Sequence, residues 1–134
     1  MDGEKKKILI VDDDTFLLDM YALKFSQNNF EVYTAVGGLQ SVEKLKGGLK
    51  PDIILMDLIM PEMDGFEMLE NINKEKLSPD SIKIVLSNKS QQSDVDKTIA
   101  LGASGYIVKA SSTPVEVVDQ VISILNKKVL TATK

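Results

Sequence analysis

Two apolar runs in this chain end in acidic side chains. Residues 8–11 (ILIV) lead into three aspartates at residues 12–14, and residues 53–56 (IILM) lead directly into Asp57. A carboxylate at the edge of an apolar core is costly unless a partner stabilises its charge. Clustered carboxylates also raise one another's pKa unless a hard cation lies among them. Mg²⁺ fits such a cluster, because it prefers oxygen ligands in octahedral geometry and keeps several waters.

Two further apolar runs end in a hydroxyl and an ammonium group. Residues 82–86 lead into Ser87, and residues 106–108 lead into Lys109. A lysine and a hydroxyl beside a metal-binding carboxylate cluster are suited to binding phosphoryl oxygens. If the polar residues that follow these four apolar runs meet in the fold, the chemistry that they favour is phosphoryl transfer.

The pattern of apolar residues predicts how these ends are positioned. Five short apolar runs predict strands, at residues 8–11, 32–35, 53–56, 82–86 and 106–108. Helical spacing follows each strand, in segments at residues 17–25, 39–45, 68–72, 95–100 and, beginning with Pro114, 114–125. Strands that alternate with helices indicate a parallel α/β sheet with right-handed crossovers. Ligand sites in such sheets lie beyond the carboxyl ends of the strands, so we expect the polar run ends to converge there.

Each of these residues also has a purely structural interpretation. The aspartates at residues 12–14 could cap the first helix, and Asp14 is the expected cap. Asp57 could begin a turn through its side chain. Lys109 could be a solvated charge at a strand end, and Tyr106, within the fifth strand, a half-buried core aromatic. Their joint occurrence at the same end of four strands favours the functional interpretation.

Composition narrows the functional classes. The chain has 134 residues, 43% of them hydrophobic, which fits one domain over residues 1–128 followed by a short polar tail at 129–134. It contains no Cys, His or Trp, which excludes disulfides, thiolate metal sites and histidine ligands. All 16 basic residues are Lys against 20 acidic ones, and the net charge of −4 argues against a nucleic-acid surface. The run at residues 8–11 is too short to span a bilayer, so we expect a soluble cytoplasmic protein with no membrane partner.

Four stretches in a fixed order carry a resemblance to a known family. They are ILIVDDD from residue 8, PDIILMDLIMPEMDG from residue 51, IVLSN from residue 84 and GASGYIVKA from residue 102. Over nearly its whole length the chain resembles the receiver domain of two-component response regulators, and its size is close to that of the stand-alone chemotaxis type. The resemblance implies an α/β fold: a flavodoxin-like (βα)₅ three-layer sandwich whose five-stranded parallel sheet has the order 2-1-3-4-5.

By the same resemblance, Asp57 is the phosphoacceptor. It would take a phosphoryl group from a phosphohistidine on a partner, either a sensor histidine kinase or a histidine phosphotransfer protein. Asp13 and Asp57 would bind Mg²⁺ directly, together with the backbone carbonyl of Ile59, and Asp12 would act through water. Because the chain has no His, the donor must be another molecule, or a small acyl or amide phosphate.

Three further residues gain roles from the resemblance. Lys109 would balance the phosphoryl charge, and the Ser87 hydroxyl would donate a hydrogen bond to a phosphoryl oxygen. Movement of Ser87 toward the phosphate would open space into which Tyr106 rotates, which makes the switch a two-state packing change. Such a domain assists its own phosphorylation and dephosphorylation but is not a turnover enzyme.

Two residues depart from the family pattern. Asn88 follows the switch hydroxyl where a small residue is usual, and its amide could crowd the phosphoryl pocket or add a hydrogen bond. Ala110 follows Lys109 where many members have a cis-proline. We expect a trans bond here, because a cis bond before Ala costs about 2.5–4 kcal/mol.

Two other functional classes stay open at this point. A haloacid-dehalogenase-type aspartyl-phosphate hydrolase also uses strand-end Asp, Ser or Thr, Lys and Mg²⁺. However, Phe16 stands where its first motif needs Thr or Val, and no second acidic pair follows Lys109. The other class is a receiver that serves only as an unphosphorylated docking module, which would form no adduct with acetyl phosphate and Mg²⁺.

The sequence also predicts an apolar surface through which the domain could bind a partner. The last helix carries more apolar residues than one buried stripe requires, which leaves Val117 and Ile124 for a second face. With Tyr106, and with Val95 or Ile99 on the preceding helix, they could form an exposed apolar patch. Family members often use the face made by the fourth helix, fifth strand and fifth helix for dimers or targets. We therefore expect phosphorylation-dependent association there, with an unknown target or with a second copy.

Overall fold

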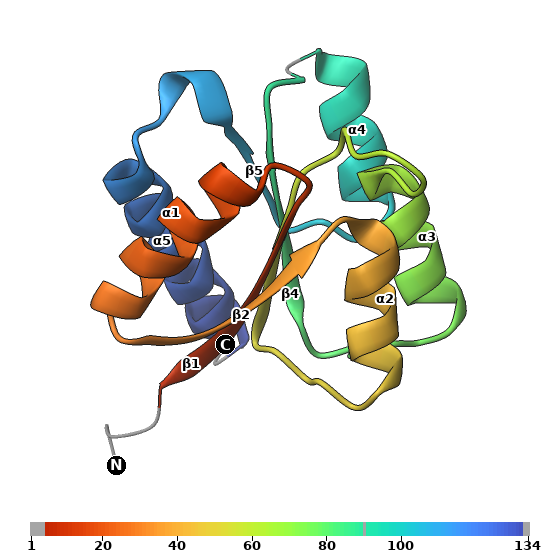
Figure 1. Cartoon of the computed structure of the whole chain (residues 1–134), viewed down its shortest axis with the longest axis horizontal. Coiled ribbons are helices and arrows are strands. Elements are labelled where there is room, and N and C mark those ends of the chain that lie inside the picture. Colours follow the sequence, from red (N-terminus) through yellow and green to blue (C-terminus); the bar gives the residue numbers. More distant parts are fainter. Residues whose placement is uncertain (1–4, 90, 133–134) are drawn as a thin grey trace.

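A five-stranded parallel sheet forms the middle layer of the fold (Figure 1). The computed structural model of the chain describes residues 5–89 and 91–132. Its strands lie in the order β2-β1-β3-β4-β5, and every neighbouring pair is parallel. Their bounds are β1 Lys6–Asp12, β2 Phe30–Val36, β3 Ile53–Met56, β4 Ile82–Ser87 and β5 Gly105–Val108. The predicted fold class and strand order are confirmed.

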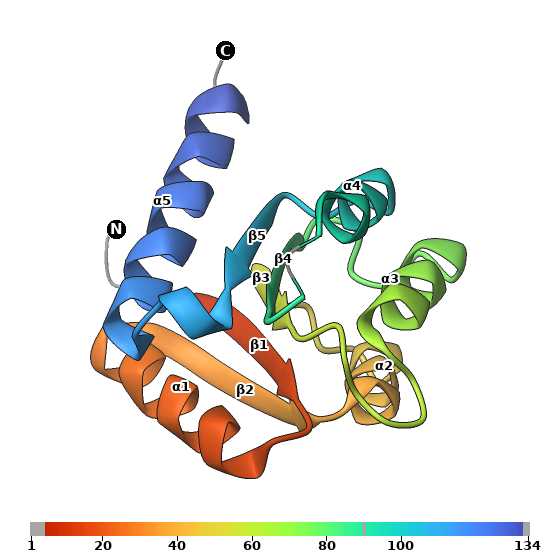
Figure 2. The same cartoon turned by 90° about the horizontal axis from the view of Figure 1, so that it is seen from above.

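Helices cover both faces of the sheet (Figure 2). One face carries α1 Thr15–Gln27 and α5 Pro114–Ala132. The opposite face carries α2 Gly38–Lys46, α3 Gly65–Lys74 and α4 Gln92–Ala100. A 3₁₀ turn lies between β5 and α5. The result is the three-layer sandwich implied by the resemblance to receiver domains.

Burial on both faces explains why the apolar runs are unbroken. In β1, Ile8 and Ile10 belong to the core layer on the α1–α5 side, whereas Leu9 and Val11 belong to the layer on the α2–α3–α4 side. All four residues of β3 are buried. A strand inside a parallel sheet is covered on both faces, so neither face can be polar.

Strand register brings the functional side chains together. The last paired residues of β1 and β3 directly precede Asp12 and Asp57, so these carboxylates follow neighbouring strands at the same level. Ser87 ends β4 and pairs with the residue before Lys109 on β5. The polar run ends therefore meet because they occupy equivalent positions of adjacent parallel strands.

Capping residues start two helices next to these strand ends. Asp14 caps α1, and its Oδ1 accepts hydrogen bonds from the N–H groups of Phe16 and Leu17 at 3.0 and 3.2 Å, which confirms the predicted cap. Asp64 caps α3 in a capping box with Glu67.

The packing of α5 overturns part of the predicted apolar face. Val117, expected on an exposed second face, is 0% exposed and lies in the core layer between α5, α1 and the sheet. Ile124 is half-buried and packs against the same layer, so close to β5 that a Cβ on Gly105 would lie 2.5 Å from its Cδ1. The buried arc is wide because α5 packs against both α1 and the sheet. These two residues therefore form no exposed patch.

The end of α5 differs from the prediction as well. The helix continues to Ala132, so residues 129–132, expected in a tail, are helical. Residues 133 and 134 of that expected tail lie outside the described residues. Within the described part of the chain, none of the helices combines the length and the hydropathy needed to cross a membrane.

Candidate functional site

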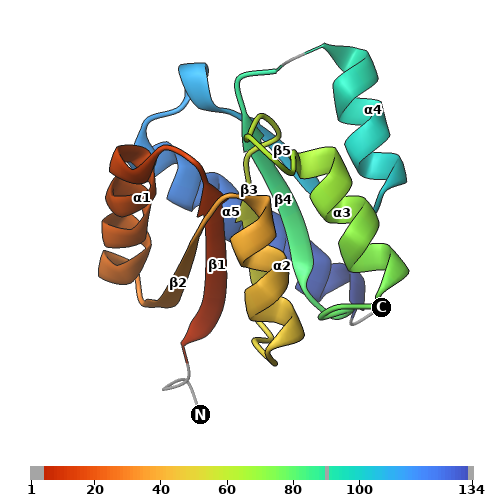
Figure 3. The same cartoon turned by 45° about the vertical axis from the view of Figure 1, so that its right-hand side comes forward.

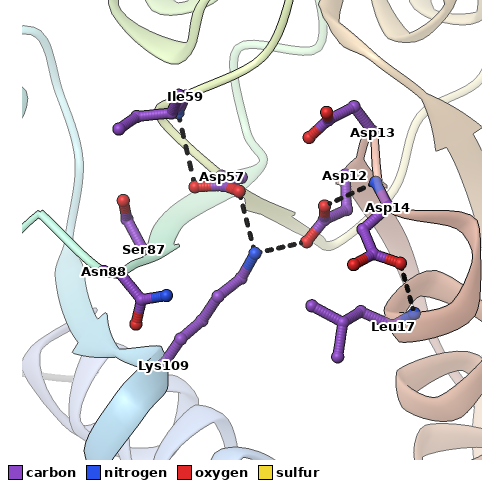
Figure 4. A pocket seen from close by; sticks show the side chains of 9 residues that line it. All are labelled: Asp12, Asp13, Asp14, Leu17, Asp57, Ile59, Ser87, Asn88 and Lys109. Atoms are coloured by element: carbon purple, nitrogen blue, oxygen red, sulfur yellow. Dashed lines mark hydrogen bonds and ion pairs between the residues drawn. The ribbon is translucent and has the colours of Figure 1, made fainter.

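The carboxyl ends of four strands meet at one edge of the sheet, at the top of Figure 3. There, Asp12, Asp57, Ser87 and Lys109 line one cavity of about 350 Å³ (Figure 4). The other lining residues are Asp13, Asp14, Leu17, Ile59 and Asn88. The structure thus brings together every site residue predicted from the sequence except Tyr106.

Lys109 joins two carboxylates across this cavity. Its Nζ donates to Oδ2 of Asp12 at 2.7 Å and to Oδ2 of Asp57 at 2.8 Å. Each of the three side chains has at most 10% of its surface exposed. Buried charges need partners, and here one ammonium group serves two carboxylates. Because two negative charges face one positive charge, the group can still attract a further cation.

Burial and pairing shift the pKa values of Asp12 and Lys109. Burial raises the pKa of Asp12, and the hydrogen bonds from Lys109 and from the Asp14 N–H offset only part of that effect. For Lys109, burial lowers the pKa, but the hydrogen bonds and charges of Asp12 and Asp57 outweigh burial and raise it. Lys109 is therefore a permanent cation near neutral pH.

Both carboxylate oxygens of Asp57 are held in place. Oδ2 accepts from Lys109, and Oδ1 accepts from the N–H groups of Leu58 at 2.7 Å and Ile59 at 3.4 Å. The backbone N–H of Asp57 donates to the carbonyl of Val11 at 3.1 Å, which ties it to β1. The side-chain turn considered as a structural alternative is therefore present, and it orients the carboxylate in the cavity.

The loop after Asp57 folds tightly onto it. Gly65 donates its N–H to the carbonyl of Leu58 at 2.8 Å. A Cβ on Gly65 would lie 2.6 Å from the carbonyl oxygen of Asp57, a backbone atom that cannot move aside. The glycine of the MPEMDG stretch is thus required by the close approach of α3 to the strand end.

Three carboxylates could bind a metal ion. Asp12, Asp13 and Asp57 each offer one oxygen, and these oxygens lie within 4.8 Å of one another. Asp12 Oδ1 is held by the Asp14 N–H at 3.0 Å. The Asp13 side chain is exposed and makes no hydrogen bond or ion pair within the described residues. A partly exposed, all-oxygen ligand set suits Mg²⁺, because this ion keeps waters on its open side.

Ser87 and Tyr106 are connected through one loop residue. Ser87 is fully buried, and its Oγ accepts a hydrogen bond from the Lys89 N–H at 3.2 Å. The Tyr106 hydroxyl donates to the Lys89 carbonyl. Tyr106 packs against the α2–α3–α4 core layer and does not line the cavity. The backbone of Lys89 therefore links the buried hydroxyl of the site to an aromatic ring outside it.

Comparison with known proteins identifies the family. A model of the response regulator receiver domain matches residues 8–121. The chain belongs to this family. It is 41% identical over 105 residues to the chemotaxis protein CheY of Thermotoga maritima, which covers 78% of this chain and 85% of that protein. Identity to the chemotaxis protein CheY of Bacillus subtilis is 39% over 122 residues, or 90% of this chain and 95% of that protein.

A solved structure agrees with the fold of this receiver. The CheY-like receiver domain protein of Methanospirillum hungatei superposes with a TM-score of 0.83 at 26% identity. The superposition covers 96% of this chain and 99% of that chain. Strand order and helix placement are thus those of the family over nearly the whole chain.

Family membership gives the acidic cavity a functional class. Receiver domains of two-component systems accept a phosphoryl group and use Mg²⁺ at an acidic site, and they are signalling modules rather than turnover enzymes. The cavity with Asp12, Asp13 and Asp57 fits that chemistry. Neither the family match nor the relatives support the hydrolase alternative.

The two departures from the family pattern lie beside the cavity. Asn88 is exposed and lines it next to Ser87. The Lys109–Ala110 bond is trans, as expected. Lys109 itself begins the 3₁₀ turn Lys109–Ser111, and Ala110 lines an adjacent hollow together with Lys109 and Asn88.

Sequence reasoning missed two residues around the site. Leu17 of α1 packs against the core layer on the α1–α5 side and also lines the cavity. Helical spacing cannot show that the first turn of α1 reaches the strand ends. Lys89 links Ser87 to Tyr106 through its backbone N–H and carbonyl. Because nearly every residue type offers both groups, the sequence carries no signal for such a role.

Proposed function

We propose that Asp57 is the residue that receives the phosphoryl group. One of its carboxylate oxygens attacks the phosphorus of a phosphohistidine on a sensor histidine kinase or a histidine phosphotransfer protein. The P–N bond breaks, the imidazole leaves with the bonding electrons, and Asp57 becomes an acyl phosphate. The observation that carries this proposal is a carboxylate only 8% exposed at the edge of a cavity, with the Lys109 ammonium 2.8 Å away.

Asp13 and Asp57 would bind Mg²⁺ directly in this proposal, together with the backbone carbonyl of Ile59. The free carboxylate of Asp13 and the position of Ile59 in the cavity lining support this ligand set. When bound, the ion supplies positive charge that reduces the repulsion between the carboxylate and the incoming phosphoryl group. Asp12 acts through water, because both of its carboxylate oxygens already accept hydrogen bonds, one from Lys109 and one from the Asp14 N–H.

Lys109 and Ser87 bind the transferred group. Before transfer, Lys109 shares its protons between Asp12 and Asp57. Phosphorylation moves the negative charge of Asp57 outward onto the phosphoryl oxygens, and Lys109 follows that charge while it keeps Asp12 as its second partner. Ser87 turns its hydroxyl hydrogen to another phosphoryl oxygen. Lys109 and Ser87 also hold the phosphoryl group while water attacks its phosphorus, which releases phosphate and regenerates the Asp57 carboxylate. The domain therefore assists both its phosphorylation and its dephosphorylation.

The position of Ser87 sets the position of Tyr106. When Ser87 moves to the phosphoryl group, its contact with the Lys89 N–H loosens, and the Tyr106 hydroxyl releases the Lys89 carbonyl and turns inward. This change alters the face made by α4, β5 and α5, where Ile99 is 56% exposed. That face binds an unknown protein target or a second copy of the chain. We place this exchange in the cytoplasm, where the proposed donor presents its phosphohistidine.

Acetyl phosphate with Mg²⁺ tests the proposal. Intact-mass measurement should show one added phosphoryl group, and hydroxylamine should remove it, because hydroxylamine cleaves acyl phosphates. Absence of any adduct with this donor and with a phosphohistidine donor would instead support an unphosphorylated docking module. Turnover of a phosphomonoester by the pure protein would support the hydrolase class.

A further inference from the structure

A hollow of about 280 Å³ adjoins the cavity that contains Asp57. It lies between the first turns of α1 and the 3₁₀ turn that leads into α5. Leu17, Asn88 and Lys109 line both spaces, so a molecule held at Asp57 can extend from the cavity into the hollow. Figure 4 shows Leu17, Asn88 and the stem of Lys109 across the cavity from Asp57.

Much of the wall of this hollow is apolar. Leu17 and Met20 supply it from α1, and Ala110 and Pro114 supply it from the chain around the 3₁₀ turn. Among the described residues that line the hollow, Lys109 alone carries a charge, and its ammonium group is already paired with two carboxylates. The hollow is therefore suited to a short uncharged group with an apolar surface.

Asn88 offers a hydrogen-bond donor where the hollow meets the cavity. Its side chain is exposed and makes no hydrogen bond to another residue in the described part of the chain. The amide N–H groups are therefore free to donate to a carbonyl oxygen of a bound molecule. An acyl group presents such a carbonyl oxygen next to an apolar chain.

We propose that the hollow receives the organic body of a small acyl phosphate that phosphorylates Asp57, and that it favours a short apolar chain. This inference rests on the proposed transfer to Asp57. A carboxylate oxygen of Asp57 attacks the phosphorus, the bond from phosphorus to the acyl oxygen breaks, and the donor's carboxylate leaves with the bonding electrons. In-line transfer places the leaving oxygen on the side of the phosphorus away from Asp57, and the residues shared with the hollow lie across the cavity on that side.

Two donors that differ only in chain length test the hollow. Acetyl and butyryl phosphate release acids of nearly the same pKa, so the bonds that break are about equally reactive and a rate difference reports contacts of the donor body. With Mg²⁺ and each donor below saturation, butyryl phosphate should phosphorylate the full chain about tenfold faster, because two more methylene groups leave water. Intact-mass measurement of the hydroxylamine-sensitive phosphoryl group gives both rates.

Variants of the apolar wall should reduce this preference. Met20→Gln replaces the thioether by an amide of similar length, and Ala110→Leu fills the hollow with a larger side chain, so both should bring the ratio of the two rates close to one. Leu23→Gln is the matched control, because Leu23 is 57% exposed on the same helix and does not line the hollow. This control should keep the wild-type ratio.

The outcomes separate this inference from the proposed function. Equal rates with the two donors, or a wild-type ratio in both Met20→Gln and Ala110→Leu, would overturn the role of the hollow and leave the transfer to Asp57 intact. Loss of the ratio in Leu23→Gln would also overturn it, because that residue lies outside the hollow. Absence of an adduct with either donor would overturn the transfer to Asp57 and this inference together.

Discussion

Nζ of Lys109 lies 2.8 Å from Oδ2 of Asp57 and bridges it to Oδ2 of Asp12, 2.7 Å away on the other side. The ammonium therefore occupies the place between two buried carboxylates that would otherwise repel each other. A metal ion bound by Asp12 and Asp57 would share the charge of these two carboxylates with Lys109. Fold stability and metal affinity are thus coupled through one side chain.

Lys109→Met should destabilise the metal-free protein by about 1–3 kcal/mol, because two buried carboxylates lose their charged partner. Mg²⁺ should then increase the free energy of unfolding more in the variant than in the wild type, because the ion would be the only cation paired with these carboxylates. Urea unfolding with EDTA and with Mg²⁺ measures both quantities. Lys46→Met removes an exposed ion pair with Glu75 and should change stability by no more than about 1 kcal/mol. Equal gains from Mg²⁺ in the Lys109 variant and the wild type would contradict the coupling.

Two adjacent aspartates should separate metal binding from folding. Asp13→Ala should abolish the response to Mg²⁺ and leave the stability with EDTA unchanged, because the Asp13 side chain makes no bond within the described residues. Asp14→Ala should lower the free energy of unfolding by about 1 kcal/mol, because α1 loses its cap, and should keep the response to Mg²⁺. Amide chemical shifts during a Mg²⁺ titration, together with urea unfolding, measure the two effects. Retained Mg²⁺ binding by Asp13→Ala would show the ligand assignment to be wrong.

Lys83→Met should stabilise the protein near pH 7 and remove one component of its pH dependence. Burial lowers the pKa of Lys83 below the ordinary 10.5. Between the folded pKa and 10.5 the unfolded chain binds more protons than the folded one, so wild-type stability should rise with pH there relative to the variant. Urea unfolding of the wild type and of Lys83→Met across the alkaline range measures the difference. A difference that shrinks toward low pH instead would contradict a Lys83 pKa lowered by burial.

The convergence of the site was predictable because it depends on topology. Once the runs before Asp12, Asp57, Ser87 and Lys109 are strands of one parallel sheet, their carboxyl ends must lie at one edge. A buried strand can be recognised from the sequence, because it appears as a short unbroken run of apolar residues. The cap at Asp14 was predictable for the same reason, since a cap involves only the neighbouring residues.

The width of the buried arc on α5 was not predictable in this way. Helical spacing gives the angle of each residue around the axis, and it placed Val117 away from the main stripe. How far burial extends depends on α1, which packs along α5 from a distant part of the sequence. Gly65 shows the opposite case, in which the residue type was visible but its reason, a backbone contact with Asp57, appeared only in three dimensions.

Ile99 on α4 carries the association proposed for the α4–β5–α5 face. Ile99→Lys should abolish the difference in self-association or target affinity between the phosphorylated and unmodified proteins, because it places a charge on an apolar side chain that is 56% exposed. Leu23→Lys makes the same change at a 57% exposed site on α1 and should have no effect. Sedimentation with and without acetyl phosphate measures self-association. Association that survives Ile99→Lys, or that Leu23→Lys abolishes, would place the interface elsewhere.

Locating the phosphoryl group is the most direct test of the central claim. The protein is phosphorylated with acetyl phosphate and Mg²⁺, the acyl phosphate is reduced with borohydride, and the resulting alcohol is located by peptide mass spectrometry. Reduction should mark Asp57 and no other residue, and Asp57→Asn should give a folded protein without the mark. A mark on Asp12 or Asp13 in the wild type, or full phosphorylation of Asp57→Asn, would contradict the assignment of Asp57 as the phosphoacceptor.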